Sequence, residues 1–488
     1  MAIQWYATEV YRVDIGDFLL PLVKTPGDTI DRLIMPRIKN FKIVFVLMLF
    51  AATVQMAHSQ ETSLPTDDAP VLTLDDAVSM ALSNNRLVKI SALEAQKYDY
   101  RLSTARTRRL PQFQLAVLGG ELMHSFDFTF DKGVFGTYPG TGPIPGDKTT
   151  IRNPARFTTY TTGSLDQPVT QQYKIGLGIR LTEFARQIAK EDVRAERQKV
   201  AAEVRTAYFE LVATQSAVLA ASESVKTLQE AQRVTKEYIV QKTVLRSDSL
   251  DVDARLAKAQ YDLSVAENGL TTQREHLNQL LGRDLTTRFR VDAMPEEDSD
   301  DLTLDAVRQK ASQNRPELRE AQLKEKQAVY DRRLAKAEYI PDLSLSVRYQ
   351  GLYNVKVLPE NVGVAGFYLS WEPFDWGRRR NNIAEKSRAI DQARNGLHET
   401  ESQIAVEVGA KYRKWKDAAL LLKATRTGHE ATSEQFRVTT TKYKEQAALI
   451  KDVLQAQAHD SEASFQYQQA LSSYWTALAE LRRAMGEE

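Results

Sequence analysis

The chain has 488 residues, and its 65 basic and 64 acidic side chains leave a formal net charge of only +1, which excludes a generally polybasic nucleic-acid-binding protein. Hydrophobic residues make up 42% of the sequence, enough to bury substantial cores and to exclude wholesale disorder. The absence of cysteine excludes disulfides, thiolate metal sites, cysteine catalysis and a lipidated-cysteine anchor.

An apolar run near the N-terminus predicts an export signal. The run at 42–54 reads KIVFVLMLFAATV and is too short for a membrane-spanning helix, which needs about 20 apolar residues. Basic residues precede it, and the small residues Ala57 and Ser59 follow at the positions that a signal-peptide cleavage site requires. We expect an upstream extension and signal peptide over 1–59, with the translation start at Met1 or Met35. A buried core helix is the alternative.

The remaining sequence contains the same pattern twice. The segment LTLD at 72–75 recurs at 302–305, and the segment LPQFQL at 110–115 has its counterpart in IPDLSL at 340–345. Repetition of several landmarks in the same order indicates a duplicated unit. We predict a first repeat over 60–282, an acidic linker over 283–301 and a second repeat over 302–488.

Each repeat changes from helical to alternating periodicity and back. Alternating stretches, each about ten to thirteen residues long, predict four strands that include Phe113, Tyr173, Leu343 and Phe367. The Gly- and Pro-rich segment 119–170 is predicted to be an irregular, exposed loop. Long helices are expected over 184–245 and 378–444, each followed by a shorter returning helix.

These elements constrain the fold class. A helix of about sixty residues extends roughly 90 Å, so the long helices must pair along apolar seams as antiparallel coiled-coil hairpins. Four strands cannot close a barrel, and an open edge is excluded from lipid. We therefore predict a mostly α fold that contributes four strands to a membrane β-barrel shared by several chains, three chains giving twelve strands. A soluble helical rod capped by a small sheet is the alternative.

The alternation also assigns the two faces of the strands. The side chains expected to face a wet lumen are Lys174, Arg180, Ser344 and Arg348. The side chains expected to face lipid are Tyr173, Ile175, Leu177, Ile179, Leu343, Leu345 and Val347.

The order of motifs from 72 to 486 resembles the TolC-like family of outer-membrane efflux proteins. The motifs that carry the resemblance are LTLDDAVSMALSNN, LTLDAVRQKASQNRPEL, RLPQFQL, YIPDLSL and SWEPFDWGRRRNNI. The resemblance implies a homotrimer whose twelve-stranded barrel lies in outer-membrane lipid and continues as an α-barrel into the periplasm. It also implies passive conduction of substrates delivered by a periplasmic adaptor (membrane fusion) protein and an inner-membrane pump or secretion ATPase.

The resemblance further places the helix-hairpin tips at a periplasmic aperture that contacts the adaptor. In the second repeat Asp452 matches the family's tip motif, whereas Gln446 replaces the usual glycine and Gln455 stands where some members have a second acid. The corresponding acids of the first repeat are Asp248 and Asp251. Three copies of these aspartates could form a carboxylate ring that favours cations. Alternatively, they cap the returning helix.

The sequence contains no recognisable catalytic set, cofactor motif or metal-ligand spacing. Its helical histidines are scattered over different predicted helices. We therefore expect neither an enzyme nor a cofactor, metal or nucleic-acid-binding protein. Two functions remain: an export duct of a tripartite efflux or type I secretion system, and a non-transporting structural coiled-coil protein of the envelope. The sequence does not distinguish drugs, metal ions and polypeptides as substrates.

Overall fold

A computed structural model describes residues 70–240, 246–292, 302–445 and 447–488. These residues belong to one compact unit that begins at Asp68. The predicted signal peptide at 1–59, residues 293–301 of the predicted linker and Gln446 lie outside the described residues.

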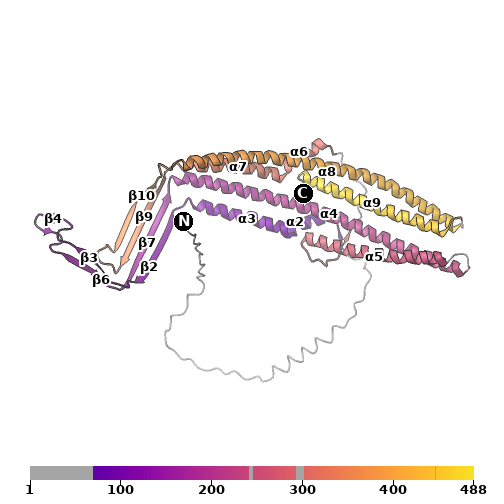
Figure 1. Cartoon of the computed structure of the whole chain (residues 1–488), viewed down its shortest axis with the longest axis horizontal. Coiled ribbons are helices and arrows are strands. Elements are labelled where there is room, and N and C mark those ends of the chain that lie inside the picture. Colours follow the sequence, from indigo (N-terminus) through magenta and orange to yellow (C-terminus); the bar gives the residue numbers. More distant parts are fainter. Residues whose placement is uncertain (1–69, 241–245, 293–301, 446) are drawn as a thin grey trace, which may run out of the picture. The chain divides into compact units, whose positions relative to one another are not determined.

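The helices follow the same order in both repeats (Figure 1). The first repeat contains α2 (Leu74–Asn84), α3 (Arg86–Thr107), α4 (Gln171–Val240) and α5 (Arg246–Leu281). The second contains α6 (Leu304–Asn314), α7 (Pro316–Ala337), α8 (Arg378–Lys444) and α9 (Ile450–Ala484). The hairpins α4–α5 and α8–α9 confirm the predicted long helices and returning arms. The repeat boundaries stay a prediction.

In the described ranges no helix combines the length and the apolar composition needed to cross a bilayer.

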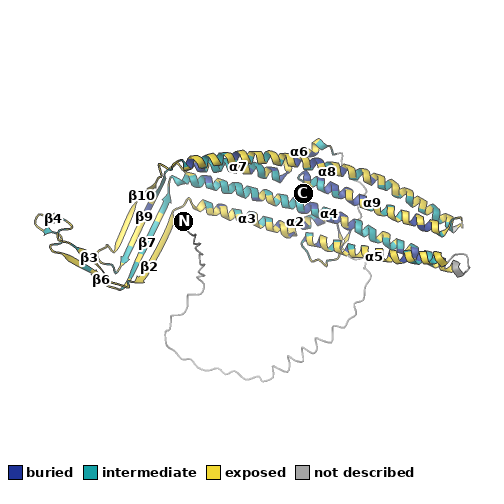
Figure 2. Cartoon of the chain, in the orientation of Figure 1, coloured by how far each residue is buried: buried dark blue, intermediate teal, exposed yellow. Residues whose placement is uncertain are grey.

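Equivalent tyrosine hydrogen bonds connect the long helix of each repeat to the segment that precedes the first helix of that repeat. The hydroxyl of Tyr208 on α4 donates to the carbonyl of Leu72 at 3.0 Å, and that of Tyr412 on α8 donates to the carbonyl of Leu302 at 3.1 Å. Tyr208 belongs to the main apolar core, and the partly buried Tyr412 packs against it. Figure 2 shows buried residues on both α4 and α9, and the core also includes residues of α2, α5, α6 and α8.

A glycine with positive φ ends each returning arm. Gly282 (φ +70°) follows α5, and Gly486 (φ +82°) follows α9. Gly282 lies against the backbone of Asn84, at the break between α2 and α3, and Gly486 lies against Asn314, at the break between α6 and α7. The close approach of two backbones at a left-handed residue explains why both positions are glycine.

The main sheet has the strand order β10-β9-β7-β2, with all neighbours antiparallel. Its strands are β2 (Gln112–Glu121), β7 (Phe157–Pro168), β9 (Asp342–Tyr353) and β10 (Asn361–Ser370). Hydrogen bonds from Gln171 and Lys174 to Ser344 and Asp342 fix the start of α4 against β9, so the sheet lies at one end of the long helices (Figure 1).

The second strand lies elsewhere than predicted. Residues 173–182 belong to α4, and the strand of the first repeat is β7, inside the segment predicted to be an irregular loop. β7 reads FTTYTTGSLDQP, a threonine-rich sequence that suits a strand but lacks apolar alternation. In α4, Leu177 and Phe184 recur at helical spacing; Leu177 is buried and Phe184 packs on Tyr330 of α7.

This correction removes six residues from the predicted barrel surface. They lie on the first turns of α4 and not on a strand: Tyr173, Lys174, Ile175, Leu177, Ile179 and Arg180.

The rest of the segment between β2 and β7 forms an ordered arm. Its strands are β3 (Phe126–Phe130) paired with β6 (Thr149–Asn153), and β4 (Thr137–Tyr138) paired with β5 (Gly142–Pro143). Arg152 and Asp127 form an ion pair across β3 and β6 at 3.2 Å. At the base, buried Asn153 accepts a hydrogen bond from the backbone N–H of Lys356, in the turn between β9 and β10, at 2.6 Å. The second repeat therefore holds the arm of the first.

Two short strands complete the structure. β1 (Val71–Leu72) and β8 (Arg290–Val291) pair in parallel beside α2.

Candidate functional site

The main sheet has one apolar and one polar face. The register places Leu115, Val347 and Phe367 on the same face, because directly paired residues of neighbouring strands share a face. The predicted lipid-facing residues of β9 all lie on this apolar face: Leu343, Leu345 and Val347. Most of its large side chains are exposed, Phe367 by 75% and Phe113 by 70%.

The opposite face is polar and hydrogen-bonded. It carries the two residues of β9 that were predicted to face a lumen, Ser344 and Arg348. Ser346 donates to the carboxylate of Asp166 at 2.6 Å, and the Arg348 guanidinium lies 5.6 Å from the ring centroid of Tyr368. Sequence reasoning missed Asp166, because it lies on the strand that was predicted to be a loop.

Both edges of the sheet are open. Among the residues that the structure describes, strands β2 and β10 each pair on one side only, and every residue of both strands is exposed. An apolar face requires a nonpolar environment, yet unpaired strand edges are not tolerated in lipid. The sheet therefore needs further strands at both edges before it can enter a bilayer.

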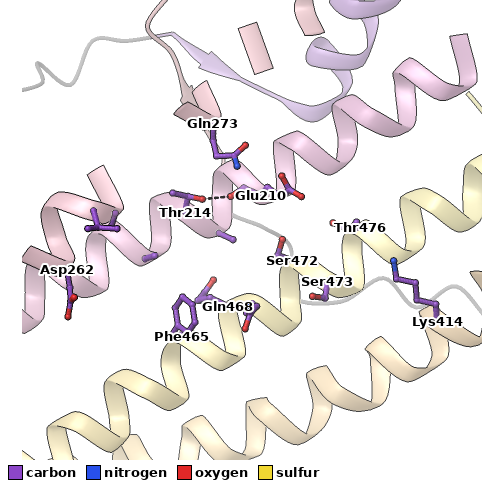
Figure 3. A pocket seen from close by; sticks show the side chains of 15 residues that line it. Glu210, Thr214, Asp262, Gln273, Lys414, Phe465, Gln468, Ser472, Ser473 and Thr476 are labelled. Atoms are coloured by element: carbon purple, nitrogen blue, oxygen red, sulfur yellow. Dashed lines mark hydrogen bonds between the residues drawn. The ribbon is translucent and has the colours of Figure 1, made fainter. Parts of the chain in front are cut away.

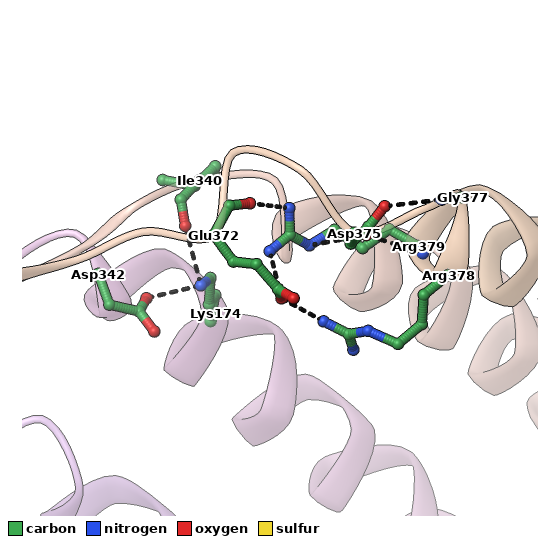
Figure 4. A network of polar contacts seen from close by, with 8 residues as sticks. All are labelled: Lys174, Ile340, Asp342, Glu372, Asp375, Gly377, Arg378 and Arg379. Atoms are coloured by element: carbon green, nitrogen blue, oxygen red, sulfur yellow. Dashed lines mark hydrogen bonds and ion pairs between the residues drawn. The ribbon is translucent and has the colours of Figure 1, made fainter.

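An ion-pair network joins the sheet to the helices (Figure 4). The Lys174 ammonium contacts the carboxylate of Asp342 at 2.6 Å and the carbonyl of Ile340 at 3.0 Å. Arg379, on the first turn of α8, is 6% exposed and donates to the carbonyl of Glu372 at 2.6 Å and to its carboxylate at 3.1 Å. These contacts connect the first turns of α4 and α8 to the start of β9 and to the segment that follows β10.

Asp375 caps α8 in the same network. Its carboxylate accepts hydrogen bonds from the backbone N–H groups of Arg379 at 3.0 Å and Gly377 at 3.1 Å. These bonds, that from Arg379 foremost, lower the pKa of the Asp375 carboxyl. Because the folded-state pKa is lowered, the cap is complete at neutral pH and is lost as the pH falls through that value.

At the hairpin tip, Asp452 acts as a helix cap. It lies on the first turn of α9, is exposed, and accepts a hydrogen bond from the backbone N–H of Leu449 at 3.1 Å. Gln455 is exposed one turn further along α9. This geometry supports the capping interpretation of Asp452 and leaves its carboxylate accessible.

The tip acids of the first repeat lie on α5. Asp251 is exposed and pairs with Arg255 at 3.1 Å on the same helix. Asp248 belongs to the first turn of α5, but its side chain lies outside the described part of the chain, as does Gln446. Sequence reasoning missed Asp253, which accepts a hydrogen bond from Gln232 of α4 at 2.6 Å and so links the two arms of the hairpin.

A groove of about 670 Å³ lies between parts of the two hairpins, which contact each other elsewhere through α4 and α9 (Figure 3). Small and carboxamide side chains of α4, α5 and α9 line it, together with Phe465 and Lys414. Its two carboxylates, Glu210 and Asp262, lie on different helices, and Asp262 already pairs with Lys258 at 2.9 Å. Within the described ranges no cluster of three or more His, Asp or Glu side chains could hold a metal ion.

Comparison of the sequence with models of known protein families identifies the family of this chain. A model of outer membrane efflux proteins matches residues 77–283 and 307–487, most of both repeats. The chain belongs to the outer membrane efflux protein family. This family consists of efflux proteins and not of enzymes, and its members are located in the outer membrane. The resemblance found in the sequence is thereby confirmed.

Solved structures share the fold of this efflux protein at low sequence identity. The outer membrane channel CmeC of Campylobacter jejuni is 16% identical, with a TM-score of 0.65 over 85% of each chain. The open state of the MtrE channel of Neisseria gonorrhoeae is 17% identical, with a TM-score of 0.64 over 89% of this chain and 96% of that chain. VceC of Vibrio cholerae is 13% identical, with a TM-score of 0.66 over 85% of this chain and 96% of that chain. No curated protein matches the chain.

We expect the stability of the ion-pair network between the sheet and α8 to depend on Arg379 and not on its neighbour Arg378. Replacing Arg379 with methionine removes a buried cation from two acceptors of Glu372 and should lower the free energy of unfolding by about 1–3 kcal/mol. Arg378 contacts the same carboxylate, but its side chain is 63% exposed. Arg378→Met should therefore change the free energy of unfolding by less than about 0.5 kcal/mol. Thermal or denaturant unfolding measures both. Equal effects would contradict the assigned role of the network.

The two interpretations of Asp452 are separated by replacing it with asparagine and with alanine. Asparagine keeps the hydrogen-bond acceptor, so we expect Asp452→Asn to preserve the tip, whereas Asp452→Ala should cost about 1 kcal/mol of local stability. Hydrogen exchange of the amides in the first turn of α9 measures this difference, with Gln455→Ala as the control. If Asp452→Asn channels lost cation selectivity while the hydrogen exchange of these amides stayed unchanged, the carboxylate ring would be established instead.

Proposed function

We propose that three copies of the chain form an outer-membrane channel, the exit duct of a tripartite efflux or type I secretion system. The observation that carries this proposal is a four-stranded sheet with one exposed apolar face and two open edges. Three such sheets contribute twelve strands, an even number that closes an antiparallel barrel. The apolar face contacts lipid, and the face with Asp166 and Arg348 lines the lumen.

The helices extend this duct into the periplasm. Helix α4 has 70 residues and spans about 105 Å at 1.5 Å per residue. The hairpin tips, with Asp251 and Asp452, form the aperture that contacts a periplasmic adaptor protein and an inner-membrane pump or secretion ATPase. The pump supplies the energy, and conduction through the duct itself is passive.

Export precedes assembly in this proposal. The signal within 1–59 directs the chain out of the cytoplasm and is removed, so the mature protein begins near Gln60. N-terminal sequencing of protein isolated from the outer membrane tests this step. A sequence that begins at Met1 or Met35 would contradict cleavage.

The absence of cysteine from the chain allows a direct test of barrel closure. One cysteine at Ala116 on β2 is combined in turn with cysteines at Val362, Val364 and Gly366 on β10; all four positions lie on the polar face of the sheet. Adjacent copies should cross-link when the two Cα atoms come within about 7 Å, so at least one pair should give covalent trimers.

Mass and conductance complete the test. Light scattering in mild detergent should give a trimer, and planar bilayers should show a conducting pore. A soluble, non-conducting monomer without cross-links would favour the structural coiled-coil protein.

A further inference from the structure

The C-terminal end of α3 and the following turn carry a run of positive charge. Between Tyr100 and Gly120 the sequence contains four arginines and no carboxylate. All four side chains are exposed. We call this set the basic collar; it consists of Arg101, Arg106, Arg108 and Arg109.

Carboxylates near the collar are engaged by other cations. Asp99 pairs with Arg186 at 2.5 Å, and Asp342, on β9, pairs with Lys174 at 2.6 Å. Within the described part of the chain no ion pair joins a carboxylate to the last three arginines of the collar. Their positive charge is therefore available to an external anion.

A groove adjoins the collar. It has a volume of about 780 Å³ and lies between α3, α4 and α7. Arg101, Arg108 and two tyrosines, Tyr98 and Tyr100, contribute to its wall, whereas Ile175 and Ile179 provide an apolar floor. At Gly178, also in the lining, a Cβ would meet no atom within 4 Å. The groove thus combines guanidinium groups with an open apolar surface.

The position of the groove relative to the sheet indicates a lipid. α3 ends at Thr107 and β2 begins at Gln112, so the collar lies next to the end of the apolar sheet face, where Phe113 is exposed. Headgroups lie at the level where an apolar membrane surface gives way to polar protein. Arginine binds phosphate in a bidentate manner, tyrosine is enriched at this level, and clustered basic residues attract anionic lipids.

We propose that this groove binds the headgroup of an anionic phospholipid, with the basic collar on the phosphate and part of an acyl chain over Ile175 and Ile179. The proposal rests on the membrane channel proposed above. It gives the collar a defined role: a lipid bound beneath β2 stabilises the transition from strand to helix at the membrane surface.

Site-specific fluorescence quenching tests the proposal. Thr104, in the groove wall, is replaced by cysteine and labelled with a fluorophore in the otherwise cysteine-free chain. The trimer is reconstituted into phosphatidylcholine vesicles that contain either brominated phosphatidylglycerol or, at the same mole fraction, brominated phosphatidylcholine. We expect the anionic lipid to quench more strongly, and this preference to decrease with rising salt.

Three variants identify the cause of the preference. Combining Arg106→Gln with Arg108→Gln should lower the preference roughly fivefold per arginine. The matched control, Arg86→Gln with Lys89→Gln, removes two exposed cations from the other end of α3. It should leave the preference for the anionic lipid unchanged. Gly178→Leu fills the groove without changing its charge, favours the helical conformation, and should also abolish the preference.

The remaining outcomes overturn the proposal. Equal quenching by the two lipids would indicate a nonspecific lipid contact, and no quenching by either would place the groove on the water-filled side of the wall. Quenching that inorganic phosphate reverses would indicate a soluble anion. Light scattering of every sample keeps this result separate from the channel proposal, because a sample that is not trimeric contradicts the channel and not the lipid site alone.

Discussion

Gly282→Ala is expected to lower the free energy of unfolding by about 2–4 kcal/mol, a large effect for a single methyl group. The residue has φ +70°, and an added Cβ would lie 2.5 Å from the carbonyl oxygen of Asn84 and 2.8 Å from its carbonyl carbon. Both are backbone atoms, and neighbouring Asn85 is itself fixed by a hydrogen bond to the carbonyl of Leu280 at 2.8 Å. Relief of the overlap therefore requires movement of the break between α2 and α3.

The second repeat provides an independent replicate of this experiment. At Gly486 an added Cβ would lie 2.8 Å from the backbone of Asn314, so Gly486→Ala should be destabilising by a similar amount. Gly269→Ala is the matched control: this residue lies inside α5, its Cβ would meet only the methyl group of Thr214 at 3.7 Å, and alanine favours a helix. Denaturant unfolding followed by circular dichroism measures all three. If the control and Gly282→Ala proved equally stable, the proposed backbone contact would be wrong.

Val347→Arg should prevent assembly of the membrane-inserted trimer. Val347 lies near the middle of β9 on the apolar face, between Leu165 and Ala365. An arginine on the lipid face costs about 2–4 kcal/mol at the bilayer midplane, and a trimer would carry three of them. Gln350→Arg places the same side chain on the polar face of the same strand, between Thr162 and Val362, and should be tolerated. The yield of trimer in the membrane fraction distinguishes the two variants.

Equal behaviour of these two variants would contradict the assignment of the faces. If both assembled, the sheet would not contact lipid, and the structural coiled-coil protein would become the better explanation. If neither assembled, the polar face would be tightly packed and not line a wet lumen.

Local periodicity predicted the elements whose environment is uniform along their length. Helix α8 occupies 378–444 as predicted, because its solvated and packed faces alternate at helical spacing throughout. The faces of β9 were also predictable, since Leu345 and Ser346 point to opposite sides of the sheet. The alternation from Tyr173 to Leu181 was misleading because these residues lie on the first turns of α4, where Leu177 is buried while Tyr173 and Arg180 are exposed.

Contacts between distant segments could not be predicted in the same way. β7 is recognisable only through its neighbours: it lies between β2 and β9, which supply the hydrogen bonds that a polar, threonine-rich segment needs to remain a strand. The role of Arg379 likewise depends on Tyr339 and Glu372, which precede α8 by different distances in sequence. Such partners are set by the topology and not by the local sequence pattern.

The ordered arm between β2 and β7 has a consequence for recognition from outside the cell. The two strand hairpins of each chain differ, because one carries the arm while the other ends in a short turn that includes Asn354 and Lys356. In the proposed trimer, raised arms and low turns therefore alternate around the rim. A duplicated chain that would otherwise present six equivalent sites presents three, so an antibody or other external ligand directed at the arm meets a trivalent epitope.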